Sequence, residues 1–257
     1  MKTIIIKIGT KILTNESNQL DLNNLRRLTA EISDLIHNHH LNCIIVSSGA
    51  IVSGSETLLL SPTTIPEKQA AASVGQILLL KEYHQFFSHH GIPIGQILLT
   101  KDVTDHDEKR HNVTNTLENL LAKKIVPIIN ENDSVATDEI QFGDNDILTS
   151  IVAQLIPIDL VVFLTDTEGV YDKDPTKHQD ASLISQLTSI SDDLIDQTLD
   201  AYDAKGKGGM KSKLIAAKTC HEHGIPVVIA HGRHPSLSLD DIIMNQKSGT
   251  WIQSENH

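Results

Sequence analysis

Short apolar runs alternate along this chain with longer segments in which apolar residues recur at helical spacing. The spacing of Leu25, Leu28 and Ile32 is typical of a helix with one buried face. Strands are predicted at Thr3–Ile8, Cys43–Val46, Gly95–Leu99, Val126–Ile129, Leu160–Leu164 and Pro226–Ile229. Helices are predicted within Leu25–Ile36, Ala70–Phe87, Leu117–Leu121, Ile147–Leu155 and Leu214–Cys220.

This alternation predicts an α/β fold, a three-layer αβα sandwich around a mostly parallel central sheet. Ile and Val dominate the apolar runs, as strands buried on both faces require. The 257 residues contain no Pro/Gly/Ser-rich linker and no internal repeat, so we expect one domain with two lobes. The lobes would meet near residue 158, giving lobes 1–158 and 159–257. Segment 134–142 is expected to form a hairpin or an ordered loop.

Composition narrows the classes of function. A net charge of −12 argues against a general nucleic-acid binder or a protein that binds anionic membranes. No secretion signal opens the chain, and no apolar run reaches the roughly 20 residues of a membrane-spanning helix, so a cytoplasmic protein is expected. Cys43 and Cys220 lie in apolar segments and are interpreted as small buried hydrophobic residues. Most of the 14 histidines are interpreted as solvated or helix-capping residues, and no metal ligand set is predicted.

Polar residues gather where predicted strands end. The strand at Val126–Ile129 runs into Asn130, Glu131, Asn132 and Asp133, and a second polar cluster, Gly143 to Asp146, opens the next helix. In α/β proteins the carboxyl ends of the strands are where ligand groups are placed. The mixture of acids and amides suits a small polar ligand that carries an amine.

Four further motifs could bind phosphate or substrate, and each has a simpler alternative. Lys7 ends the first strand and could reach a phosphate, or it could be a solvated charge. Ser48 and Gly49 could offer backbone amides, or form an ordinary turn with a serine cap. Residues 206–213, GKGGMKSK, could wrap phosphate oxygens or form a flexible charged loop. Thr165 and Asp166 could bind a nucleoside or belong to a plain loop.

Taken in order, these motifs resemble the amino acid kinase family, in its branch that phosphorylates the side-chain carboxylate of glutamate. The resemblance rests on IIIKIGTKILT near the start, VSSGAI at 46–51, INENDSVATDEIQFGDND at 129–146, FLTDTEGVYDKDP at 163–175 and KGGMKSKL at 207–214. It covers nearly the whole chain, and NEND…GDND is its most discriminating part.

The resemblance implies transfer of the γ-phosphoryl group of ATP, with Mg²⁺, to L-glutamate, which gives L-glutamyl 5-phosphate, the first step of proline biosynthesis. It implies catalytic roles for Lys7 at the transferring phosphoryl group, for Lys213 at the nucleotide phosphates, and for Asp146 in orienting both lysines. Glutamate would contact Ser48, Gly49, Asp133 and Asn145. The nucleotide would contact Lys7, Thr165, Asp166, Lys207, Gly208, Gly209, Met210, Lys211, Ser212 and Lys213.

The resemblance also implies feedback inhibition by proline and a homo-oligomer, either a dimer or a tetramer. The chain departs from the family in two respects: no C-terminal RNA-binding-like PUA domain is present, and Lys207 stands where threonine is common. Two other hypotheses are open. The acceptor could be another small carboxylate, carbamate or a nucleotide monophosphate, or the chain could be a non-catalytic sensor of proline or ATP.

Overall fold

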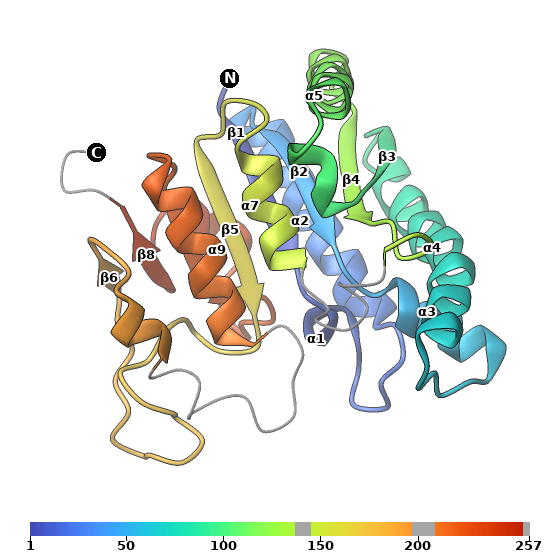
Figure 1. The fold of residues 1–257 in the computed structure, drawn as a ribbon. Coiled ribbons are helices and arrows are strands. Elements are labelled where there is room, and N and C mark those ends of the chain that lie inside the picture. Colours follow the sequence, from blue (N-terminus) through green and yellow to red (C-terminus); the bar gives the residue numbers. More distant parts are fainter. Residues whose placement is uncertain (137–144, 197–208, 254–257) are drawn as a thin grey trace.

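The computed structural model describes residues 1–136, 145–196 and 209–253. Within these residues, strands form one eight-stranded sheet in the order β3-β4-β2-β1-β5-β7-β8-β6, with helices on both faces (Figure 1). The strands are β1 (Thr3–Ile8), β2 (Asn42–Ser47), β3 (Ile94–Leu99), β4 (Val126–Glu131), β5 (Leu160–Thr165), β6 (Gln186–Leu187), β7 (Val227–His231) and β8 (Thr250–Ile252). Neighbouring strands are parallel from β3 to β7, and the β7–β8 pair is antiparallel. The predicted fold class is therefore confirmed.

Helices fill the two outer layers. They are α1 (Thr10–Leu13), α2 (Leu22–His39), α3 (Ala50–Leu58), α4 (Ile65–Ser88), α5 (Asp107–Ala122), α7 (Asn145–Ala153), α9 (Met210–Glu222) and α10 (Leu239–Ile243), with a 3₁₀ helix η1 (Lys101–Thr104). No helix of the described residues has both the length and the apolar character needed to cross a bilayer.

All six predicted strands are present, with small shifts at their ends. The prediction that the last of them begins at Pro226 is wrong, because proline has no N–H to donate; only the carbonyl of Pro226 contributes, by accepting from the Val161 amide at 3.0 Å. Strands β6 and β8 were not predicted. They have two and three residues, too few for an alternating pattern to be visible.

All five predicted helices begin earlier than the apolar pattern predicted. Helix α2 starts at Leu22 instead of Leu25, and α9 starts at Met210 instead of Leu214. Helix α4 starts at Ile65 instead of Ala70, since Thr64 and Glu67 form a capping box at its start. Helix α5 starts at Asp107 instead of Leu117. Its first turns are polar and Leu117 is its buried residue, so the apolar pattern did not reveal the start. Helix α7 starts at Asn145 instead of Ile147. The predicted hairpin or loop falls mostly on residues 137–142, which lie outside the described residues.

The alternation of side chains along β1 separates two cores. Ile4, Ile6 and Ile8 pack against α2, α4 and α10 on one face of the sheet. Ile5 packs on the other face, in the core that α5, α7 and α9 complete. Successive side chains of a strand point to opposite faces, so Lys7 shares the face of Ile5. The sequence of one strand thus directs its single lysine towards α7 and α9.

Both cysteines are buried, as predicted from their apolar neighbours. Burial raises the pKa of the Cys43 thiol and of the Cys220 thiol, each to about 12. A thiol with so high a pKa is almost entirely protonated at neutral pH and is therefore a poor nucleophile. Neither cysteine is a candidate for catalysis.

Candidate active site

Lys7 is a buried cation at the carboxyl end of the central strand β1. Only 4 % of its surface is exposed. Removing an unpaired ammonium from water is very costly, so a lysine in this position requires an anionic partner. Its partner comes from the helix layer on the same face of the sheet.

That partner is Asp146, in the first turn of α7, whose side chain has no exposed surface. Its Oδ1 lies 2.6 Å from Nζ of Lys7, and its Oδ2 lies 3.3 Å from Nζ of Lys213, in the first turn of α9. The Ser212 hydroxyl donates to the same Oδ2 at 2.6 Å. Strand β1 and helices α7 and α9 thus meet at one carboxylate, and the three residues predicted to be catalytic lie together.

One carboxylate contacts two ammonium groups in this cluster. Burial acts to raise the pKa of Asp146, but Lys7, Lys213 and the Ser212 hydrogen bond outweigh it and lower this pKa to about 2. Asp146 is therefore ionised at neutral pH. A buried group of two ammoniums and one carboxylate is suited to bind a further anion, such as a phosphoryl group.

The start of α9 adds backbone donors beside these charges. Gly209 is the N-cap of α9 and makes no side-chain cap hydrogen bond, and no acidic residue lies in the first turn. The first amides of a helix, together with its dipole, form a favourable site for phosphate. Met210 is buried, and Lys211 and Ser212 are half-buried in the same turn. The predicted residues Lys207 and Gly208 lie outside the described residues.

An amide cluster lies on the carboxyl side of β2 and β4. The Asn145 side-chain amide nitrogen lies 2.9 Å from the Ser48 hydroxyl, 3.0 Å from the Ser47 carbonyl and 2.9 Å from Oδ1 of Asn130. The Asn130 amide in turn donates to Gln76 of α4 at 2.7 Å. Oδ1 of Asn145 is buried and accepts no hydrogen bond within the described structure. A buried acceptor of this kind is available to a donor on a ligand, such as an ammonium.

Ser48 and Asn145, both predicted to contact glutamate, lie within hydrogen-bond distance of each other. Asn130 was predicted only as part of the polar cluster after its strand, and Gln76 had no predicted role. Gln76 lies inside a helical pattern, outside any such cluster, and carries no comparable signal. Gly49 adopts the left-handed region with φ +103° and is the N-cap of α3, where a side chain would be strained. Asp133 lies half-buried in the turn after β4.

Thr165 and Asp166 follow the carboxyl end of β5. The Asp166 carboxylate lies 2.9 Å from Nζ of Lys11, in α1, and both side chains are largely exposed. Burial acts to raise the Asp166 pKa, but the Lys11 contact lowers it overall. Lys11 is a further candidate that had no predicted role, although it is the second lysine of the KIGTK motif. It brings a third cation to this edge of the sheet.

A parallel α/β sheet that brings buried lysines and a helix amino terminus to its carboxyl edge is suited to a phosphotransferase. The sequence model described as "Amino acid kinase family" matches residues 2–231. The chain belongs to the amino acid kinase family.

Curated relatives extend over nearly the whole chain. A protein of Clostridium tetani (strain Massachusetts / E88) named "Glutamate 5-kinase" is 43 % identical over 256 residues, which cover 99 % of this chain and 95 % of the relative. A protein of the same name from Thermoanaerobacter sp. (strain X514) is 41 % identical over 249 residues, which cover 96 % of this chain and 66 % of the relative.

Among solved structures, the carbamate kinase from Giardia lamblia bound to AMP-PNP superposes with a TM-score of 0.70. The match covers 99 % of each chain at 15 % identity. At this identity the similarity bears on the fold, and it agrees with the family match.

Proposed function

We propose that this chain transfers the γ-phosphoryl group of ATP to the side-chain carboxylate of L-glutamate and forms L-glutamyl 5-phosphate. The single observation that carries the proposal is the buried cluster of Lys7, Asp146 and Lys213 at the edge of the sheet where ligands bind. The names of relatives more than 40 % identical to the chain support glutamate as the acceptor. The reaction would be the first step of proline biosynthesis.

The two lysines would act on opposite sides of the migrating phosphoryl group. Phosphoryl transfer asks for alignment and positive charge, with little covalent work from the protein. Lys7 would contact the equatorial oxygens of the phosphoryl group, and Lys213 would stabilise the charge that develops on the leaving diphosphate. Asp146 would hold both ammoniums in place, so that no reorganisation is needed when charge develops.

Glutamate would be bound by the groups around Asn145. Its ammonium would be recognised by Asp133 and by the buried Oδ1 of Asn145, which has no partner in the described structure. The hydroxyl of Ser48 and the backbone at Gly49 would contact a carboxylate of the substrate. An acceptor without a free ammonium would leave these oxygens unpaired, which gives the site a basis for discrimination.

ATP would enter with Mg²⁺ bound to its phosphates. The described residues contain no group of three or more His, Cys, Asp or Glu that could hold a metal ion. Magnesium is commonly held by substrate phosphates and water, with few protein ligands. The nucleotide would contact Thr165, Asp166 and residues 207–213, while residues 1–158 would provide the glutamate groups.

Three subsidiary proposals follow from family membership. Proline would act as a feedback inhibitor, the protein would be a dimer or a tetramer, and it would act in the cytoplasm. These properties do not enter the catalytic argument above.

An acceptor screen tests the proposed function. ADP release is measured with ATP and Mg²⁺ in the presence of L-glutamate, L-aspartate, N-acetyl-L-glutamate, carbamate or UMP. Glutamate alone is expected to support steady turnover, because relatives named glutamate 5-kinase are more than 40 % identical to the chain. Faster turnover with N-acetylglutamate would contradict the assignment of the ammonium site, and no ADP release with any acceptor would favour a non-catalytic sensor.

A second test compares the variant Lys213→Met with its matched control, Lys218→Met. Both residues lie on α9, but Lys213 is buried at Asp146, whereas Lys218 pairs at 2.7 Å with the exposed Asp192. Loss of one donor to a transition-state charge lowers kcat by about 100-fold or more. Lys218→Met is expected to keep full turnover, and equal activity of the two variants would remove Lys213 from the mechanism.

A further inference from the structure

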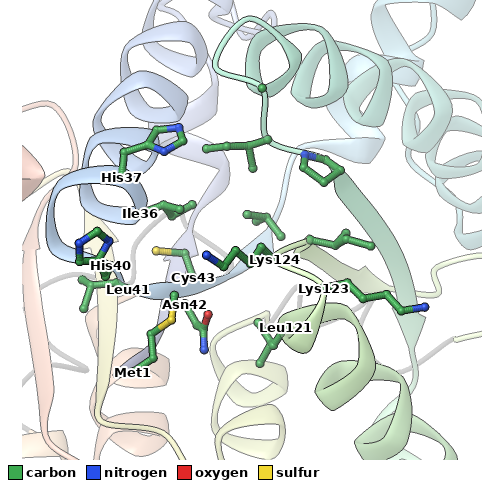
Figure 2. A pocket seen from close by; sticks show the side chains of 15 residues that line it. Met1, Ile36, His37, His40, Leu41, Asn42, Cys43, Leu121, Lys123 and Lys124 are labelled. Atoms are coloured by element: carbon green, nitrogen blue, oxygen red, sulfur yellow. The ribbon is translucent and has the colours of Figure 1, made fainter.

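A cleft of about 500 Å³ opens at the amino ends of β2 and β4, at the edge of the sheet opposite to the candidate active site (Figure 2). The end of α2, the turn from α4 to β3 and the turn from α5 to β4 line it. A volume of this size lies in the range of about 300–1,000 Å³ that is usual for small-molecule sites. No group of the proposed catalytic mechanism lies in this cleft.

The floor of the cleft is apolar. Leu41, Ile92 and Val126 are all less than 9 % exposed, and Ile36, Leu121 and Ile125 add half-buried apolar surface. The Cys43 thiol is also buried there and is protonated because of its raised pKa. This floor can therefore receive the hydrocarbon part of a ligand.

The rim of the cleft is basic in an acidic protein. Lys123, Lys124, His37 and His40 line the cleft, and no Asp or Glu is among the lining residues. The whole chain has 33 acidic and 21 Lys and Arg residues, so a random patch of its surface would be expected to contain acids. A local excess of positive charge against that background favours an anionic ligand.

Two of these side chains occupy strained backbone positions. His40 has φ +55° and Lys124 has φ +56°, which lie in the left-handed region; the third turn at the cleft uses Gly91, with φ +69°. Glycine adopts this region without strain, whereas the Cβ atom of other residues makes it unfavourable. The strain at His40 and Lys124 thus accompanies side chains that both line the cleft.

Helix capping explains part of this charge. Nε2 of His37 contacts the carbonyl of His90 at 3.1 Å, and both lysines follow the last turn of α5, where a cation suits the helix dipole. Capping does not account for the direction of Lys124. Figure 2 shows its side chain extending over the cleft towards Cys43, while Lys123 points away from the centre.

We propose that this cleft binds a small organic anion with an apolar body, such as an aromatic or aliphatic carboxylate or sulfonate. The apolar body would cover Leu41, Ile92 and Val126, and the anionic head would pair with the Lys124 ammonium, with His37 and His40 at the rim.

Fluorescence titration with 8-anilinonaphthalene-1-sulfonate, which has an anionic head on an aromatic body, tests the proposal. The titration is done without nucleotide and again with saturating Mg·ATP, which occupies the proposed nucleotide site. One probe per chain is expected to bind. Loss of one exposed charge contact should weaken binding about fivefold in Lys124→Gln and more in Lys124→Glu. The matched controls are Lys81→Gln and Lys81→Glu, since Lys81 is an exposed lysine of α4 outside the cleft.

A neutral probe separates charge from hydrophobicity. N-phenyl-1-naphthylamine has the same ring system without the sulfonate, and its affinity is expected to be the same in wild type and in Lys124→Glu. Wild-type affinity of the sulfonate for Lys124→Glu would overturn the proposal, as would its complete displacement by Mg·ATP. A change of oligomeric state in Lys124→Glu, measured by light scattering, would instead identify the cleft as an interface between copies of the chain and would also overturn it. Thermal unfolding of each variant verifies that the fold is intact.

Discussion

Asp146 contacts more charged groups than a buried carboxylate normally does, because each of its oxygens meets a different lysine. Removing one partner of a buried ionic group leaves the others uncompensated. An exposed ion pair behaves differently, since water solvates both charges and little is lost when the pair is broken. The chain contains both kinds of pair, which allows a direct comparison.

We predict that Asp146→Asn lowers the free energy of unfolding by about 3–5 kcal/mol, because it removes the charge of a buried carboxylate that contacts two buried ammoniums. The matched change Asp192→Asn, which breaks the exposed pair with Lys218, should cost less than about 1 kcal/mol. Urea unfolding at pH 7 measures both. Equal effects of the two substitutions would show that the buried Asp146 cluster contributes no more to the free energy of unfolding than an exposed ion pair does.

The difference in stability between wild type and Asp146→Asn depends on pH in a direction that the Asp146 pKa fixes. The Asp146 pKa is lowered from its ordinary value of 3.8 to about 2 in the folded protein. Its contribution to stability is therefore fully present above about pH 4 and is lost as the pH falls through 2. The difference between wild type and Asp146→Asn should thus be constant between pH 7 and pH 5, and a decrease across this range would contradict the lowered pKa.

Individual residues of the site could be predicted to the extent that they end an element. Lys7 closes an apolar strand and Asp146 opens a helical pattern, so both could be placed at the ligand edge from sequence alone. Their contact could not, since it joins positions 139 residues apart, and here it was implied only by the family resemblance. The Asn145–Asn130–Gln76 chain of hydrogen bonds was missed because amides occur in ordinary turns as well.

At the scale of elements, α3 and α4 pack unusually closely. A Cβ atom added to Gly54 would lie 1.8 Å from the Ala71 carbonyl oxygen, and one added to Gly75 would lie 1.8 Å from that of Ala50. Glycine at both positions lets the two backbones touch, as small residues do at other close helix crossings. Gln76, the partner of Asn130, follows Gly75 directly, so this crossing also positions part of the amide cluster.

We predict that Gly75→Ala destabilises the protein by about 3 kcal/mol or more, although alanine is the better helix former, because the clash is with backbone that cannot move aside. The control is Ile77→Ala on the same helix, where the side chain is 73 % exposed. That substitution should stay within about 0.5 kcal/mol of wild type. Thermal or urea unfolding measures the stability of both variants. A stabilised Gly75→Ala variant would mean that α3 and α4 are not in contact at Gly75.

Sequence patterns located the elements that have a clear period and missed those that lack one. The start of α4 was readable from Thr64 and Glu67, which fit a capping box, but the apolar pattern begins only later. The polar first turns of α5 gave no signal, since a helix with a single buried residue has almost no apolar stripe. The glycine crossing of α3 and α4 depends on tertiary contact, which no local pattern encodes.

Across the whole molecule, the candidate catalytic groups are attached to the most buried part of the sheet. β1 hydrogen-bonds to β2 on one side and to β5 on the other, and all six of its residues are buried. β3 has the same length but, among the described residues, pairs with β4 alone, and it exposes Gln96 and Leu98. Lys7 and the residues after β2 and β5 are therefore carried by strands that open only when much of the fold opens.

We predict that amide hydrogen exchange follows this order from centre to edge. Opening of β1 exposes two hydrogen-bonded neighbours and both apolar cores, so its amides should exchange only through global unfolding, at a free energy of about 5–15 kcal/mol. Opening of β3 breaks one ladder and exposes less apolar surface, so its amides should exchange by local opening with a lower free energy.

Mass spectrometry of peptides covering residues 3–8 and 94–99 measures the two strands in one experiment. Increasing urea should accelerate exchange of 3–8 steeply and that of 94–99 weakly, because only the first depends on exposing the whole core. Equal protection and equal urea dependence of the two peptides would show that the sheet opens as a single unit. The central position of β1 would then not make Lys7 more rigidly placed than a residue of β3.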